Sequence, residues 1–197
     1  MCKRPPAAFS LIELLLVVVI ILVLTTLYWH SGSANRQQAL KAGCQSNLQK
    51  LYLALQIYSN EQAGKFPATN GARTAEEPLD LLIPKYTADT SFFICPASAD
   101  SPPPSGDSLT KHKISYAYFM GWSAKDAQQI LMSDKQVDTS PKTVGQAIFS
   151  TSGSPPGNNH DKSGGNLLFC DGHTDPCPAL APFAIPVPPA IQLLNPK

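Results

Sequence analysis

An apolar run near the N-terminus constrains this chain more than any other feature. From Phe9 to Trp29 the sequence contains one charged side chain, Glu13, among leucines, valines and isoleucines. About 20 predominantly apolar residues are enough for a helix to cross a bilayer. A carboxylate at the centre of such a helix costs about 2.5 to 3.5 kcal/mol on insertion scales, so we expect Glu13 to have a function. The run predicts a transmembrane helix over residues 9–30, with Lys3 and Arg4 on the cytoplasmic side.

Other interpretations of the same segment have different consequences. A secretory signal peptide would be cleaved after its apolar core, near Gly32-Ser33-Ala34, and would release a chain that starts near Asn35. Glu13 interrupts that core, and the run is longer than the usual 7 to 15 residues. A simple membrane anchor explains the apolar residues but not the acid. A buried helix of a soluble protein would be unusually apolar on all sides.

The order of basic leader, Phe9 and Glu13 resembles the N-terminus of type IV pilins and type II secretion pseudopilins, which are bacterial filament proteins. The resemblance implies that a prepilin peptidase removes the leader, residues 1–8, by cutting between Ala8 and Phe9, and methylates the new amino terminus. It also implies that Glu13 pairs with this amine on a neighbouring subunit. The family usually has glycine where this chain has Ala8, a departure that we expect to slow cleavage.

The segment 31–63 is predicted to continue the helix beyond a flexible point at Ser31-Gly32-Ser33. Apolar residues recur at steps of three and four, as on one face of a helix: Leu40, Cys44, Leu48, Leu51, Leu55 and Tyr58. Gly64 and Pro67 are stop signals. Joined to the apolar run, this helix would have about 54 residues and a length of about 80 Å.

The remaining residues, 64–197, are predicted to form a β-rich head. The expected fold class is α+β, pilin-like, with a long N-terminal helix packed on a small antiparallel sheet. Strands are expected near residues 92–95, 114–119, 130–133, 147–150 and 166–170. The tail from Pro176 to Lys197 has seven prolines in 22 residues, so it should be extended. Its apolar residues favour packing on the head or a neighbouring subunit, and a loose surface tail is the alternative.

A C-terminal signature resembles the processing-associated motif of major-pseudopilin-like proteins. It comprises Asn159-His160, Gly164-Gly165 and Asp171-Gly172. Such proteins usually place nine residues between the His and the Asp-Gly pair, whereas this chain has ten, from Asp161 to Cys170, which indicates an insertion in the loop after His160. Residues 166–170 should form a strand, and Asp171-Gly172 a hairpin turn in which glycine tolerates positive φ. Gly164 and Gly165 would admit a close backbone approach.

The same region carries side chains that could bind a metal: Asp134, His160, Asp171, His173 and Asp175. Turn formation and loop-fixing hydrogen bonds are the stronger explanation of the same residues, and no zinc or EF-hand spacing appears. We therefore expect no metal and no other cofactor. A Gly-x-Ser-x-Gly elbow and a phosphate-binding loop are also missing from the sequence, so we expect no enzymatic activity.

Four cysteines, Cys44, Cys95, Cys170 and Cys177, remain once Cys2 leaves with the leader. They allow three pairings, and sequence does not fix the choice. The first expectation is a Cys170–Cys177 disulfide across a turn. Cys44, on the apolar helix face, is most simply a small buried hydrophobe.

The formal net charge of +1 argues against nucleic acid binding. The predicted function is that of a structural subunit of a pseudopilus or type IV pilus-like filament, assembled through its N-terminal helix for protein secretion or a related envelope process. The implied partners are the prepilin peptidase, other subunits and the inner membrane. The predicted location is the bacterial inner membrane, as a single-pass protein with a cytoplasmic N-terminus and a periplasmic head. The alternative is a membrane-anchored periplasmic enzyme or binding domain.

Overall fold

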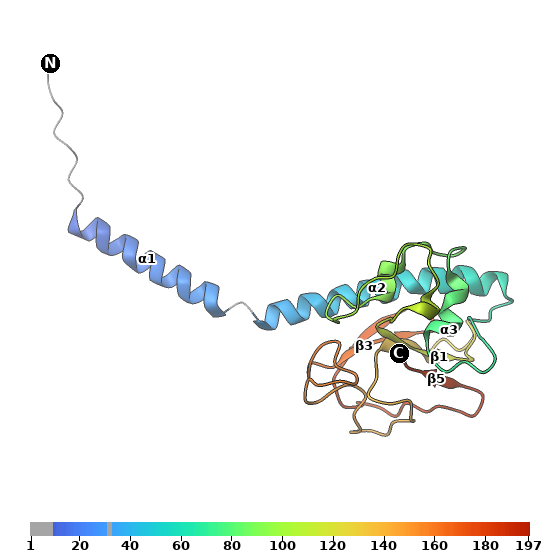
Figure 1. The fold of residues 1–197 in the computed structure, drawn as a ribbon. Helices are drawn as coiled ribbons and strands as arrows, with labels where there is room; N and C mark the ends of the chain where they lie inside the picture. Colours follow the sequence, from blue (N-terminus) through green and yellow to red (C-terminus); the bar gives the residue numbers. More distant parts are fainter. Residues whose placement is uncertain (1–9, 31–32) are drawn as a thin grey trace, which may run out of the picture. The chain divides into compact units, whose positions relative to one another are not determined.

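A computed structural model describes residues 10–30 and 33–197. The chain forms two compact units, which meet between Arg36 and Gln37. Helix α1 (Leu11–His30) belongs to the first unit, and helix α2 (Ser33–Glu61) extends from the first into the second, which also contains the sheet and the C-terminus (Figure 1).

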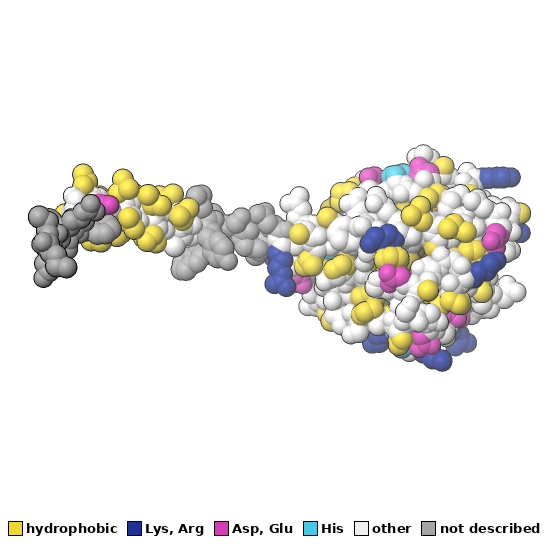
Figure 2. Space-filling model, turned by 90° about the horizontal axis from the view of Figure 1, so that it is seen from above, with side chains coloured by type: hydrophobic (Ala, Val, Ile, Leu, Met, Phe, Trp, Pro, Cys, Tyr) yellow, Lys and Arg dark blue, Asp and Glu magenta, His cyan; other side chains and the backbone are white. Residues whose placement is uncertain are grey.

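The aliphatic side chains of α1 between Leu11 and Leu24 are exposed in the described chain. All thirteen leucine, isoleucine and valine residues from Leu11 to Leu24 are exposed, with exposed fractions from 44% at Val17 to 82% at Leu11. Figure 2 shows hydrophobic side chains spread over this helix. Glu13 lies in its first turn. This helix therefore presents a large apolar surface to its surroundings.

The predicted fold class was wrong in its central element. In place of one long N-terminal helix, the structure has two separate helices, and residues 31–32 between them lie outside the described residues. In the sequence, Ser31-Gly32-Ser33 has low intrinsic helix propensity, because glycine costs a helix about 1 kcal/mol relative to alanine and serine favours caps and turns.

The predicted location must also be corrected. Across residues 10–30 and 33–197, no helix meets the combined requirement of length and apolar character for a membrane span. This finding overturns the prediction of a single-pass inner-membrane protein.

The head is built on a five-stranded antiparallel sheet with the order β4-β3-β2-β1-β5. The strands are β1 (Tyr116–Met120), β2 (Ile130–Asp134), β3 (Gly165–Phe169), β4 (Thr174–Cys177) and β5 (Gln192–Leu194). Short helical segments precede the sheet in sequence: α3 (Glu76–Leu79) and the 3₁₀ segments η1 (Asp80–Leu82), η2 (Thr90–Phe93) and η3 (Leu109–Lys111).

Three of the five predicted strands are present, as β1, β2 and β3. The expected strand at residues 92–95 is replaced by η2, because the Asp89 side chain accepts a hydrogen bond from the Ser91 N–H and caps a helical turn. The segment 147–150 forms a single bridge, Ala147 to Leu180. The edge strands β4 and β5 were not predicted. Pro176 lies within β4, an edge position that a residue without an N–H can occupy.

Both faces of the sheet are covered. Because side chains alternate along a strand, Tyr116 and Tyr118 of β1 enter one core while Ala117 and Phe119 enter another. The first core includes the apolar face of α2, with Cys44, Leu48, Leu51 and Leu55 fully buried. The second includes tail residues Ala181, Ile185 and Ile191. The tail therefore packs on the head, which was one of the predicted alternatives, and is not a loose surface tail.

Candidate functional site

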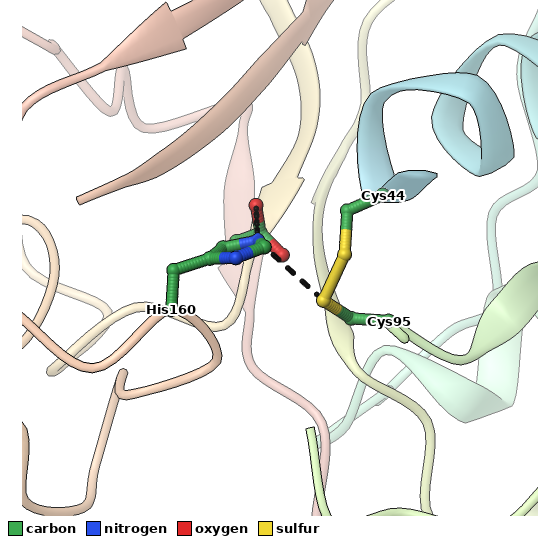
Figure 3. Close-up of side chains that lie close together, drawn as sticks. Cys44, Cys95 and His160 are labelled. Carbon is green, nitrogen blue, oxygen red and sulfur yellow. Dashed lines mark hydrogen bonds and ion pairs between the residues drawn. A yellow bond between two sulfur atoms is a disulfide. The ribbon is translucent and has the colours of Figure 1, made fainter. Parts of the chain in front are cut away.

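Four buried side chains of metal-ligating or redox-active type meet between α2 and the sheet. Cys44 comes from α2, Cys95 follows η2, Asp134 ends β2, and His160 lies in the loop before β3. All four are at most 1% exposed, and one ligand-type atom from each lies within 4.8 Å of all the others. Figure 3 shows the His160 ring directed at the two cysteines. The structure thus gathers residues that are up to 116 positions apart between Cys44 and His160.

The two cysteines of this cluster form a disulfide, with their Cα atoms 5.0 Å apart. The expected Cys170–Cys177 bond is not formed, and both of these thiols are free and buried. The hairpin register explains the difference, since Cys177 pairs with Gly165, at the opposite end of β3 from Cys170. Five residues of strand separate these positions by about 16 Å. Burial raises the pKa of Cys170 to about 12 and that of Cys177 to about 11.

The Asp134 carboxylate is held by amide donors from two directions. Asn159 Nδ2 donates to Oδ1 at 3.0 Å, while the backbone N–H and the Nδ2 of Asn166 donate to Oδ2 at 2.8 and 3.1 Å. Asn159 Nδ2 also donates to the Ser115 carbonyl at 2.7 Å. A buried carboxylate is tolerated only when such donors replace its water. The amides therefore fix both the position and the orientation of Asp134.

His160 stands between the carboxylate and the disulfide. Its Nε2 is 3.3 Å from Asp134 Oδ2 and 3.5 Å from Cys95 Sγ. Its Nδ1 is buried and has no hydrogen-bond partner among the described residues. One ring nitrogen of His160 thus contacts both Asp134 and Cys95, and the other nitrogen contacts neither.

Lys41 of α2 lies near the site, within the electrostatic influence of Asp134. Its ammonium donates to the carbonyls of Ser163 and Cys177, both at 3.1 Å. Burial lowers the pKa of Lys41, and the nearby charge of Asp134 acts in the opposite direction. This cation therefore links α2 to Ser163, directly before the glycine pair, and to Cys177, at the end of β4.

The glycine pair lies where no other residue fits. Gly164 has φ of +84°, and a Cβ there would lie 2.1 Å from the Cys177 carbonyl oxygen. A Cβ on Gly165 would lie 2.6 Å from the Phe149 ring. These contacts give the physical reason for the close backbone approach that the sequence predicts at this pair.

The predicted hairpin turn at Asp171-Gly172 joins β3 to β4. Gly172 has φ of +92°, and its N–H donates to the Phe169 carbonyl at 3.0 Å. The Asp171 carboxylate accepts from the His173 N–H at 3.1 Å. Desolvation opposes ionisation of Asp171, but the hydrogen bonds from His173 outweigh it and hold the pKa of this carboxyl below its usual value.

The five candidate metal ligands divide into two groups. Asp134 and His160 lie together in the buried cluster, whereas Asp171 and His173 lie in the exposed turn, with His173 Nε2 3.9 Å from Asp175. His173 also stacks on Phe169, with ring centroids 4.1 Å apart. Since β3 separates the groups, they cannot share one ion.

Sequence reasoning did not assign Cys95, Asn159 or Asn166 to this site. Asn159 belongs to the C-terminal signature and Asn166 directly follows its glycine pair, and that position in the sequence was the only available signal. Cys95 could be paired with Cys44 only by knowing the tertiary fold, because the four cysteines allow three pairings.

The predicted processing residues Ala8 and Phe9 lie outside the described residues. Glu13 is exposed in the first turn of α1. Comparisons with protein-family models, with curated proteins and with solved structures found no match.

Proposed function

We propose that this chain is a structural subunit of a filament of the type IV pilin and pseudopilin class. In this proposal α1 of each copy packs against α1 of other copies. The observation that carries it is the apolar surface of α1, whose thirteen leucine, isoleucine and valine residues are each at least 44% exposed. The leader, Phe9 and Glu13 of the sequence, which resemble the N-terminus of that class, support the same conclusion.

The area of this surface is sufficient to drive association. Complete burial of a leucine or valine side chain contributes about 1.5 to 3 kcal/mol, so covering the half-exposed residues of α1 would contribute about 1 kcal/mol each. The summed contribution of thirteen such residues exceeds the lower estimates of the free-energy cost of association, which are about 4 kcal/mol. Exposed apolar patches of this extent mark interaction surfaces.

A second copy of α1 fits this surface because it is apolar on all sides. A helix with apolar residues around its whole circumference can contact several neighbours at once. Contacts between unlike faces of identical subunits produce open helical filaments when the rotation does not close a ring. Repeated α1-to-α1 contacts of this kind would give a filament with the heads carried outside the helical core.

Glu13 supplies the polar element of this packing. It is the one charged residue in α1 and lies in the first turn. The resemblance gives it a partner, the methylated amine that a prepilin peptidase creates at Phe9 of a neighbouring subunit. A charge pair in a low-dielectric surrounding sets register, because a shift would leave both charges unpaired.

Two tagged versions of the full chain, co-expressed and extracted with mild detergent, test this proposal. Leu16→Cys, placed on exposed α1, should give a bismaleimide-linked dimer that the wild type lacks, and Asp175→Cys on the exposed head should not. Glu13→Ala should reduce co-purification of the two tagged copies by about tenfold, whereas Asp175→Ala should leave it unchanged. If Leu16→Cys gives no more dimer than Asp175→Cys, α1 is not the assembly surface and the proposal fails. Mass spectrometry of the mature N-terminus should locate the cut before Phe9.

A further inference from the structure

We propose that Cys44, Cys95, Asp134 and His160 form a zinc site when the two cysteines are reduced. The ligands would be the two Sγ atoms, His160 Nε2 and an Asp134 carboxylate oxygen. This site is independent of α1 and of the proposed filament contacts, because all four residues belong to the second compact unit.

The distances already match a tetrahedral zinc. With zinc bonds of about 2.3 Å to sulfur and about 2.0 to 2.1 Å to nitrogen and oxygen, tetrahedral geometry places sulfur and nitrogen about 3.6 Å apart, and nitrogen and oxygen about 3.3 Å apart. The corresponding separations here are 3.5 Å, from Cys95 Sγ to His160 Nε2, and 3.3 Å, from His160 Nε2 to Asp134 Oδ2. The whole set of ligand atoms spans at most 4.8 Å.

The donor types also favour zinc. Two thiolates, an imidazole and a carboxylate are the ligands that zinc takes in proteins, whereas calcium and magnesium require mainly oxygen. All four ligands come from the protein and are at most 1% exposed, so a metal held here would be closed to solvent. Closed four-ligand sites are structural rather than catalytic.

An outer shell that would orient the Asp134 ligand is in place. The amides of Asn159 and Asn166 hold the Asp134 carboxylate. Groups of this kind fix the ligand geometry of metal sites, and their loss typically lowers metal affinity 10- to 100-fold.

The disulfide and the metal exclude each other, because cysteine ligates zinc only as the thiolate. A two-electron reductant such as a dithiol cleaves the Cys44–Cys95 bond and is itself oxidised to a disulfide. Zinc then replaces the two thiol protons, which pass to solvent, and the sulfurs separate to about 3.8 Å around the metal. Reoxidation removes two electrons from the thiolates and releases Zn²⁺. The thiol–disulfide potential of the surroundings decides which form is present.

Zinc binding by the purified full chain tests the proposal. After reduction with a phosphine, which does not compete for the metal, and removal of the phosphine, the chain should bind one zinc ion per molecule. The disulfide form should bind none. Cobalt(II) in place of zinc should give the visible absorption of a tetrahedral site and a thiolate charge-transfer band in the near ultraviolet.

Variants separate this site from the other thiols. Cys170→Ala/Cys177→Ala should retain full binding, because these thiols lie outside the cluster. His160→Gln should weaken binding by about 100-fold or more, a larger effect than loss of an outer-shell group. Near-ultraviolet circular dichroism of each variant checks that the head remains folded. If His160→Gln does not fold, the cobalt spectrum of the Cys170→Ala/Cys177→Ala chain decides. A six-coordinate spectrum, equal zinc binding by the disulfide form, or loss of binding in Cys170→Ala/Cys177→Ala would each overturn the proposal.

Discussion

The turn at Gly172 allows backbone strain and steric contact to be measured separately. Gly172 has φ of +92°, and an added Cβ would lie 2.4 Å from the Cε1 atom of the Tyr52 ring. Tyr52 cannot easily withdraw, since its hydroxyl donates to the Cys170 carbonyl at 3.0 Å. Gly145 provides a matched control, because its φ is +85° but an added Cβ would meet nothing within 4 Å.

The expected magnitudes follow from these two environments. A left-handed backbone costs a residue with a Cβ about 1 to 2 kcal/mol, and this applies to both Gly145→Ala and Gly172→Ala. Overpacking adds about 1 to 3 kcal/mol, but only at Gly172. Gly145→Ala should therefore reduce the free energy of unfolding by about 1 to 2 kcal/mol, and Gly172→Ala by about 2 to 5 kcal/mol. For a chain of this size each kcal/mol lowers the melting temperature by about 2 to 4 °C.

Urea unfolding of the full chain, followed by near-ultraviolet circular dichroism, measures both variants. In a Tyr52→Ala background, the additional cost of Gly172→Ala over Gly145→Ala should disappear, since the ring that the Cβ meets is gone. Equal destabilisation by Gly172→Ala and Gly145→Ala in the wild-type background would refute the close contact with Tyr52.

Two further predictions concern the stability of the head. Cys44→Ala/Cys95→Ala, measured without metal by urea unfolding under oxidising conditions, should lose about 4 kcal/mol, the loop-closure value for a disulfide that spans 51 residues; an unchanged midpoint would show that the bond does not form. Burial opposes ionisation of Asp138, but hydrogen bonds from Lys142 and Ser140 hold its pKa at about 2, below the ordinary 3.8. This lowered pKa contributes stability that is fully present above about pH 4 and is lost as the pH falls through 2. Asp138→Asn should therefore cost about 1 kcal/mol at pH 7, after allowance for the exposure of Asp138, and progressively less as the pH falls through 2. A pH-independent difference in paired acid titrations would contradict this assignment.

The parts of the fold that sequence predicted are those determined locally. Strands β1, β2 and β3 are apolar runs, and their positions could be located from those runs alone. The run at Phe92 to Cys95 has the same composition, but Asp89 caps a 3₁₀ turn there. Strand β5 lies in a proline-rich tail, where only pairing with β1 makes Gln192 to Leu194 a strand. Local composition therefore did not distinguish a strand from a 3₁₀ turn or from an extended tail at these positions.

The candidate site could be predicted only in part, because tertiary contacts assemble it. Asp134 and His160 were both considered as ligands, but they were grouped with Asp171 and His173, which are close to His160 in sequence. Pairing of β2 with β3 brings Asp134 next to Asn166 and hence to the loop that carries His160. Cys44 and Cys95 join them through packing of α2 on the sheet. Sequence proximity thus selected the wrong partners for His160.

The number of residues between His160 and Asp171 follows from the length of strand β3 and not from a binding site that the two residues share. Strand β3, Gly165–Phe169, lies between them, with Asn166 bonded to Asp134 and Leu167 and Phe169 in the second core. A one-residue shift along this strand would exchange its faces and move a leucine onto the buried carboxylate. The strand length therefore sets most of the separation, and the tenth residue can be accommodated only in the loop of residues 161–163. The two parts of the motif therefore lie at the two ends of one buried strand. His160 belongs to the cluster that contains the disulfide, and Asp171 belongs to the hairpin turn.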